Sequence, residues 1–120
     1  MYGLRKDTDL QFLKGRILQQ VAIGSYQVQF AFDADVTISI QSKFTFFDGT
    51  NEFIWTSEPS TAEVAARTVV LLGSGIQMLE TSPDGRLALG FSCGRRLTIF
   101  DSVKDFESYS INWAGEIYII

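Results

Sequence analysis

The side chains able to do chemistry are few, because the 120-residue chain has no histidine and only one cysteine. Histidine is the commonest general base near neutral pH and the commonest metal ligand, so its absence excludes Ser-His-Asp and Cys-His catalysis. One cysteine cannot build a thiolate zinc site or an internal disulfide. The sequence therefore predicts no catalytic residue, no metal and no cofactor, and it favours a non-enzymatic role.

The single thiol, Cys93, lies in a predicted turn directly before Gly94-Arg95-Arg96. Two guanidinium groups beside a thiol can lower its pKa and make it reactive. The alternative is a small residue that fills a turn, since most lone cysteines serve packing. The packing role is favoured.

Carboxylates gather in three places along the chain: at Asp33 and Asp35, at Asp48 and Glu52, and at Asp101, Asp105 and Glu107. A hydrolase of the paired-carboxylate type needs two of them in one cleft. Aspartates that form turns are the common alternative. Glu107 differs because it lies in an aromatic segment, where a buried carboxylate would need a partner such as Arg67 or Arg86.

The chain is acidic, with a formal net charge of -4 and an isoelectric point of about 4.6. Adjacent basic residues occur only at Arg5-Lys6 and Arg95-Arg96, whereas nucleic-acid-binding proteins concentrate their cations on one face. No apolar run approaches the roughly 20 residues that span a bilayer. The sequence therefore predicts neither nucleic acid nor a membrane as a partner. With no apolar signal core near Met1, it predicts a cytoplasmic protein.

The elements that must position these side chains are mainly β-strands. Tyr26, Val28, Phe30 and Phe32 alternate with polar or small residues, and a similar run follows at residues 36–41. This period of two is typical of half-buried strands. At about residues 60–72 the pattern changes to that of a helix. Its predicted start is a capping box at residues 60 and 63, and a glycine at position 73 is its predicted stop.

Two stretches of the chain resemble each other. Gly15 matches Gly73 and Gln19 matches Gln77. Further along, the first copy's Tyr26, Val28, Phe30, Val36 and Ile38 line up with Leu87, Leu89, Phe91, Leu97 and Ile99. Each copy predicts three strands joined by short turns, which favours a structural repeat over two unrelated amphipathic hairpins.

The predicted fold class is α+β. Two antiparallel three-stranded meanders, at about residues 13–47 and 73–111, form one sheet or two packed sheets, and the helix at about 60–72 packs on them. A C-terminal strand is predicted at residues 116–120. Residues 1–120 are predicted to form a single domain.

Several segments also resemble a known family. They are Leu13-x-Gly15, Ile23-Gly-x-Tyr-Gln-Val-x-Phe-x-Phe-Asp33, Asp84-Gly-Arg-Leu-Ala-Leu-Gly-Phe-Ser-Cys-Gly-Arg-Arg-Leu-Thr-Ile99 and Asp105-Phe-Glu-Ser-Tyr-Ser-Ile111. From Leu13 onward the chain resembles a family of small bacterial proteins, domain-of-unknown-function family 6188. Ser92-Cys93 stands where that family often has an acidic residue, and Tyr109 stands where tryptophan is common. Because the family has no known activity, the resemblance implies a fold and not a function.

Aromatic residues crowd the middle of the chain, and Phe47 falls out of phase with Phe44 and Phe46, so one strand face cannot bury them all. An exposed aromatic patch would indicate a protein interface. The candidate interaction residues are Phe47, Phe53, Trp55, Asp33, Asp35, Arg95, Arg96, Trp113 and Tyr118.

The leading hypothesis is a non-catalytic protein-interaction module, either immunity-like or a homo-oligomeric accessory protein. The apolar terminal strand, residues 117–120, could pair with a second copy to form a homodimer if it lies at a sheet edge. The alternative is a small-ligand-binding domain or a carboxylate-dependent enzyme. It requires a cleft between the two meanders that holds at least two of Asp33, Asp101, Asp105 and Glu107.

Overall fold

The computed structural model describes residues 10–101, 109–113 and 116–119, and within them it contains ten strands and one short α-helix. The strands and the helix have the following bounds: β1 (Leu18–Ile23), β2 (Val28–Phe32), β3 (Val36–Ile40), β4 (Lys43–Phe47), β5 (Glu52–Thr56), α1 (Ala62–Arg67), β6 (Ile76–Thr81), β7 (Leu87–Phe91), β8 (Arg96–Phe100), β9 (Tyr109–Trp113) and β10 (Glu116–Ile119).

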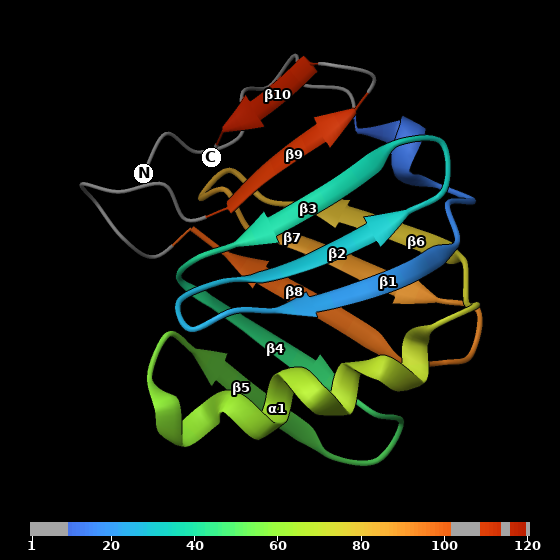
Figure 1. The fold of residues 1–120 in the computed structure, drawn as a ribbon. Coiled ribbons are helices and arrows are strands. Elements are labelled where there is room, and N and C mark those ends of the chain that lie inside the picture. Colours follow the sequence, from blue (N-terminus) through green and yellow to red (C-terminus); the bar gives the residue numbers. More distant parts are fainter. Residues whose placement is uncertain (1–9, 102–108, 114–115, 120) are drawn as a thin grey trace.

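The strands form two antiparallel five-stranded sheets. Sheet I has the order β1-β2-β3-β9-β10, and sheet II has the order β5-β4-β8-β7-β6. The two sheets lie face to face with their strands crossing at a steep angle, and α1 runs along one edge beside β5 (Figure 1). The α+β prediction is thus confirmed, and of its two versions the structure has two packed sheets.

Each sheet combines a meander from one half of the chain with a hairpin from the other half. The β1-β2-β3 meander is extended by β9 and β10, where Ile38 pairs with Ile111. The β6-β7-β8 meander is extended by β4 and β5, where Leu97 pairs with Phe46. Only residues 41 and 42 separate β3 from β4, so the chain changes sheet within two residues. The two halves of the chain therefore exchange hairpins.

The core fills the space between the two sheets. Every second residue of β2, β3, β7 and β8 points inward and is buried, which confirms the period-two prediction. Aromatic rings join the sheets: Phe30 meets Phe44 edge-on at 5.7 Å, and Phe32 stacks on Phe91 at 6.4 Å. Trp55, predicted as a surface residue, is only 3% exposed because it stacks on Phe44.

The sheets are also joined at one edge by backbone hydrogen bonds between residues 15–18 and residues 73–76, here called the clasp. The Gly15 N–H donates to the Ile76 carbonyl (2.8 Å), and the Gly73 N–H donates to the Leu18 carbonyl (2.9 Å). The N–H groups of Leu18 and Ile76 donate in turn across the clasp at 3.0 Å. Gly15 and Gly73 adopt nearly the same left-handed backbone, with φ of 85° and 84°. The matched glycines found in the sequence are thus equivalent positions of one reciprocal contact.

The structure corrects the alignment of the two copies. Ile76 faces Phe91 in β7, just as Leu18 faces Phe32 in β2, so Phe32 and not Phe30 is the counterpart of Phe91. The alignment of the two copies made from the sequence is therefore displaced by two residues. Tyr26, which it matched to a strand residue, lies in an exposed turn with 76% of its surface accessible. Gln19 and Gln77 match because each is the extra residue of a β-bulge. The bulge changes which face of the strand points inward, so that Leu18 is buried and Ile17 is exposed.

The helical segment is more broken than predicted. A 3-10 turn at Pro59–Thr61 precedes α1, and a second one at Thr68–Leu71 follows it. The predicted capping box is not formed, because the N-cap is Thr61 and its side chain caps no helix amide. The Thr61 hydroxyl bonds instead to the end of β5, accepting from the Thr56 N–H at 3.0 Å. At the other end the Thr68 hydroxyl donates to the Ala65 carbonyl (2.6 Å), which favours a tight last turn.

Tyr109 connects the two sheets through the core. Its ring is buried in sheet I, and its hydroxyl donates to the Gly85 carbonyl in the β6–β7 turn of sheet II at 2.7 Å. Burial, together with the negative charge of Asp84, raises the pKa of the Tyr109 phenol well above its ordinary value. The phenol therefore stays protonated and continues to donate this hydrogen bond in the folded protein.

Substitution of the clasp glycines tests the importance of their backbone conformation. Gly15→Ala and Gly73→Ala are each expected to lower the free energy of unfolding by about 1–2 kcal/mol, because a Cβ disfavours positive φ. Gly75→Ala is the matched control, since Gly75 lies outside the left-handed region and an added Cβ would meet its neighbours at 3.7 Å or more. Urea denaturation measures all three. Equal effects at positions 73 and 75 would contradict the importance of positive φ.

Tyr109→Phe tests the link between the sheets. The loss of a buried hydrogen bond and the unpaired Gly85 carbonyl are expected to lower the free energy of unfolding by about 1–3 kcal/mol at neutral pH. The raised pKa stabilises the fold below the unfolded tyrosine pKa of about 10, and this contribution is lost as the pH rises above that value. The stability difference between wild type and variant should therefore shrink above pH ~10. Tyr26→Phe, at an exposed site, should leave stability unchanged at neutral pH.

Candidate functional site

The acidic turn at residues 33–35 supports the clasp. The Asp33 carboxylate accepts a hydrogen bond from the Ile17 N–H at 3.0 Å, and the Asp33 N–H donates to the Ile17 carbonyl at 3.1 Å. Ser92 makes the same pair of contacts with Gly75 in the other half. Asp33 therefore has a structural role, because its hydrogen bonds to Ile17 fix the turn. Asp35 is exposed and has a left-handed backbone (φ 59°).

The other described turn carboxylates also bind nearby amides. Asp48 accepts from the N–H groups of Thr50 and Asn51, both at 2.8 Å, and these hydrogen bonds lower the pKa of its carboxyl. Asp84 accepts from the Ser82 hydroxyl and the Arg86 N–H, which lower its pKa in the same way. Within the described residues no group of three potential ligands could hold a metal ion. Asp105 and Glu107 lie outside the described residues.

The outer face of sheet II is distinctive in its side chains. Alternation places Phe47, Arg96, Gly90 and Met78 in one row across β4, β8, β7 and β6. A second row contains Thr45, Thr98, Ala88 and Glu80, and Lys43 pairs with Phe100 in a third. Sheet I presents neutral residues at comparable positions, among them Gln29, Ala31, Thr37, Ser39 and Ser110. Only sheet II therefore combines aromatic and charged side chains on the outer positions of its described strands.

Two cations on this outer face lie against aromatic rings. The Arg96 guanidinium is 5.5 Å from the centre of the Phe47 ring, and the Lys43 ammonium is 4.7 Å from that of Phe100. Arg67 on α1 covers Phe53 in the same way at 4.4 Å, which leaves Phe53 half-buried at the margin of the sheet. Exposed apolar groups lie nearby, with Ile54 at 53% and Met78 at 40% accessibility. Cation–π pairs hold these long side chains flat and keep the face ordered.

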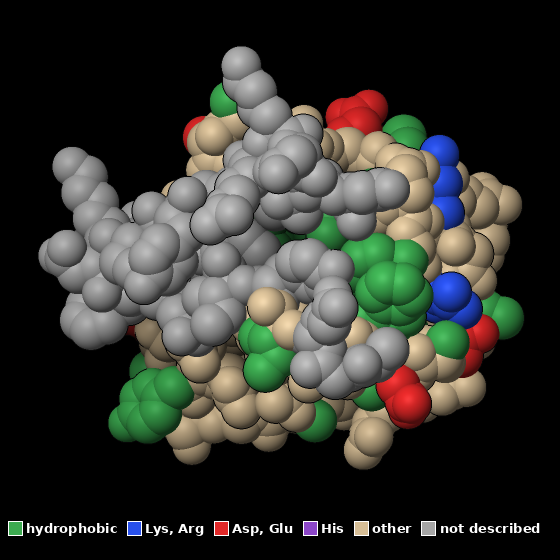
Figure 2. Space-filling view, turned by 90° about the horizontal axis from the view of Figure 1, so that it is seen from above, with side chains coloured by type: hydrophobic (Ala, Val, Ile, Leu, Met, Phe, Trp, Pro, Cys, Tyr) green, Lys and Arg blue, Asp and Glu red, His purple; other side chains and the backbone are tan. Residues whose placement is uncertain are grey.

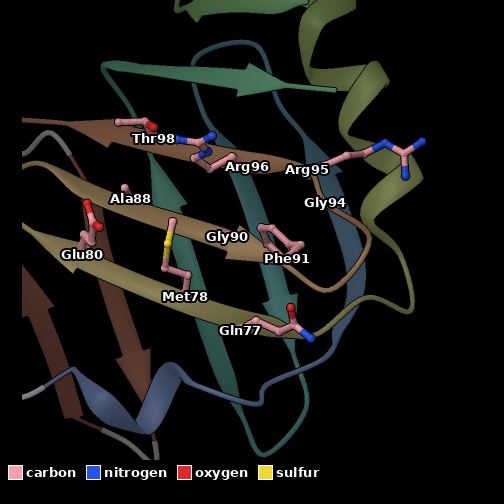
Figure 3. Close-up of a pocket in the computed structure, with 10 residues that line it drawn as sticks. All are labelled: Gln77, Met78, Glu80, Ala88, Gly90, Phe91, Gly94, Arg95, Arg96 and Thr98. Carbon is pink, nitrogen blue, oxygen red and sulfur yellow. The ribbon is translucent and has the colours of Figure 1, made fainter. Parts of the chain in front are cut away.

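A shallow groove of about 470 Å³ crosses β6, β7 and β8 on this face (Figure 3). Its floor is the small residues of β7, Ala88 and Gly90, with Met78 and Arg96 on either side and Glu80 at one end. A Cβ at Gly90 would lie 3.0 Å from the Met78 Cβ, so the absence of a side chain at Gly90 leaves the room that Met78 occupies. The short side chains of the central strand therefore keep the floor of the groove low, and Met78 covers the position of Gly90.

Of the predicted interaction residues, Arg95 and Arg96 line this groove. The Arg95 side chain extends outward at its margin in Figure 3, and its buried Nε has no hydrogen-bond partner among the described residues. Trp113 is half-buried and stacks on Phe12 at 4.2 Å. Tyr118 belongs to β10 by its backbone, but its side chain lies outside the described residues. Of the nine predicted residues, Phe47 and Arg96 therefore contact each other on the face, whereas Phe53 pairs with the buried Phe46 and packs against the core on the inner side of sheet II.

Sequence reasoning missed most of the face. Lys43, Met78, Glu80, Ala88, Gly90, Thr98 and Phe100 were assigned only to strands. A signal was available, because Ala88 and Gly90 occupy the outward positions of a strand where polar residues are usual.

Figure 2 shows another side of the molecule, where basic and acidic side chains are mixed rather than separated by sign.

Cys93 is exposed in the β7–β8 turn. Partial burial opposes ionisation of its thiol, but hydrogen bonds from Ser74 and Arg95 and the charge of Arg95 outweigh this effect and lower its pKa. The side chain is thus on the surface and polarised toward the thiolate, in contrast to the favoured packing role.

The pH dependence of alkylation tests this environment. The rate of reaction of Cys93 with iodoacetamide should reach half its maximum below the ordinary cysteine pKa of about 8.5. Arg95→Gln should move that midpoint to higher pH. Arg96→Gln, which changes the neighbouring charge but not a group that acts on the thiol, should leave it in place. Coincident profiles for wild type and Arg95→Gln would contradict the assignment.

The comparisons with known proteins place the chain without giving it an activity. No helix in the described ranges is long and apolar enough to cross a membrane. No curated protein and no solved structure matches the chain. One family model does match, that of the family of unknown function DUF6188, and it covers residues 9–120. The chain therefore belongs to the DUF6188 family.

Proposed function

We propose that the protein is a non-catalytic interaction module that binds a protein partner through the outer face of sheet II. The observation that carries the proposal is the pairing of Arg96 with Phe47 and of Lys43 with Phe100 on the same face as a groove that is floored by small residues and lined by Arg96. Aromatic residues, methionine and arginine are the types enriched at protein interfaces. An ordered arrangement of these types also reduces the entropy lost on binding.

The space between the sheets supports no competing ligand site. Side chains such as Leu89, Leu97 and Ile38, all 0% exposed, fill it in the described residues. The groove lies outside this core, on the far side of sheet II. Asp33, one of the carboxylates required in the predicted cleft, is engaged at the clasp. These contacts favour the interaction module over a cleft enzyme.

Two forms of the module differ in their partner. In an immunity-like protein the partner is a toxin, and in a homo-oligomeric accessory protein it is a second copy. Both forms use a cytoplasmic protein of net charge -4, and both need a surface that excludes water over an apolar centre. The face of sheet II meets this need in either case.

Affinity purification from cells that produce the protein tests the proposal with a matched pair of variants. Thr98→Lys places a charge in the middle of the sheet II face, and Ser39→Lys places one at the equivalent position of sheet I. Proteins retained by wild type should also be retained by Ser39→Lys and should fall at least about tenfold with Thr98→Lys. Thermal unfolding checks that both variants are folded. Equal retention by the two variants would overturn the proposal.

A further inference from the structure

We infer that the interface between the two halves of this chain also accepts a half from a second copy, so that two chains assemble by exchanging halves. Half 1 is residues 10–56, half 2 is the described part of residues 68–119, and the linker between them is residues 57–67, which include α1. The surfaces involved are the inner faces of the sheets and the clasp. The inference therefore goes beyond the proposed function, which uses the outer face of sheet II, and does not rest on it.

The order of the strands is the first support. Half 1 supplies the β1-β2-β3 meander of sheet I and the β4-β5 hairpin of sheet II, whereas half 2 supplies the β6-β7-β8 meander of sheet II and the β9-β10 hairpin of sheet I. Exchanging β1 with β6, β2 with β7, and so on to β5 with β10 converts the order of sheet I into that of sheet II. Each sheet is thus complete only where the two halves meet. Equivalent elements exchanged between two units are the arrangement of a domain-swapped dimer.

The contacts between the halves give the second support, because equivalent residues meet each other. Ile17 and Gly75 occupy equivalent positions of the clasp and form a β-bridge with each other. The hydrogen bonds of the clasp are reciprocal on either side of this bridge. Phe32 and Phe91, whose rings stack in the core, are equivalent residues as well. A residue that contacts its own equivalent indicates an isologous interface, the kind that joins two copies in a two-fold dimer.

The linker decides which half 2 reaches a given half 1. Its 3-10 turn and α1 together extend roughly 15 Å along the edge of the sandwich, from rises of about 2.0 and 1.5 Å per residue. Because the linker spans this distance, each half meets the other half of its own chain at an effective concentration on the order of millimolar. Dilute chains therefore close as monomers. Chains at a comparable concentration, or chains with a linker too short to close, exchange halves and keep the same contacts.

A disulfide across the clasp reports which chain supplies each half. Residues 17 and 75 pair directly, and a Cβ at Gly75 would lie 3.8 Å from the Ile17 side chain, within the reach of a disulfide. The probe is the full chain with Ile17→Cys, Gly75→Cys and Cys93→Ser, oxidised with glutathione disulfide after refolding from urea. In a closed monomer the disulfide lies within one chain, and in an exchanged dimer it joins two chains. Denaturing electrophoresis without reductant separates the two products.

Concentration and linker length should move the balance between these products. Refolding at about 1 mM instead of about 10 µM should raise the share of disulfide-linked dimer by roughly tenfold or more. Deletion of residues 57–67 leaves a single peptide step of about 3.8 Å where roughly 15 Å must be spanned, so the linked dimer should predominate even at low concentration. Replacement of the same residues by eleven glycine and serine residues is the matched control. It also removes α1, but it spans the distance and should give mainly the closed monomer.

Three outcomes would overturn the inference. One is a deletion variant that folds as a monomer with its disulfide inside one chain. Another is a dimer whose disulfide stays within each chain, since the copies would then associate through another surface. The third is an absence of linked dimer from the probe refolded at about 1 mM, which decides the matter even if the deletion variant does not fold. Circular dichroism identifies which variants are folded. None of these outcomes decides the proposed function, because Thr98→Lys alters the outer face of sheet II and not the contacts between the halves.

Discussion

The reciprocal hydrogen bonds of the clasp are the contact on which the rest of the sandwich depends. They join the two sheets at one edge through backbone groups alone, so each half of the chain donates and accepts in the same pattern. The left-handed backbone at Gly15 and Gly73 directs both strands into this contact. Asp33 and Ser92 then fix the neighbouring turns to it by equivalent bonds. Equivalent geometry is thus achieved with different side chains.

The two halves differ where they face solvent. The inward positions of both meanders are apolar, because both sheets contribute to one core. The outward positions are neutral in sheet I, whereas those of sheet II include aromatic, charged and very small residues. A structural requirement explains the first pattern, since the core must be filled. It does not explain the second, and for this reason the outer face of sheet II is the part of the fold most informative about function.

Much of the fold could be predicted from local sequence pattern, because alternating residues such as Leu87, Leu89 and Phe91 have one stable way to be buried. Prediction failed where a single residue changes the phase. The bulge at Gln19 buries Leu18 and exposes Ile17, and nothing in the alternation locates it in advance. The helix ends early because Thr68 bonds to the backbone of the preceding turn.

The candidate site was harder to predict than the fold for a related reason. Phe47 was identified as out of phase, and the structure shows it on the outer face against Arg96. The groove beside it depends on the register of β8 with β7 and on the absence of a side chain at Gly90. The register between two strands cannot be predicted from the sequence of either strand alone. Trp55 was misplaced because its partner ring, Phe44, is on the neighbouring strand.

The hairpin exchange also determines the order in which the molecule can be assembled. β3, at residues 36–40, remains without its neighbour β9 until residues 109–113 have been synthesised. β4, by contrast, waits only for β8 at residues 96–100. During synthesis all strands of sheet II are therefore available before β9 and β10 of sheet I. Until then the edge of β3 has no partner strand and is exposed to pairing with other chains. Pairing of β3 with β9 joins residues that lie further apart in the sequence than those joined by pairing of β4 with β8, so we expect it to be the slower of the two steps.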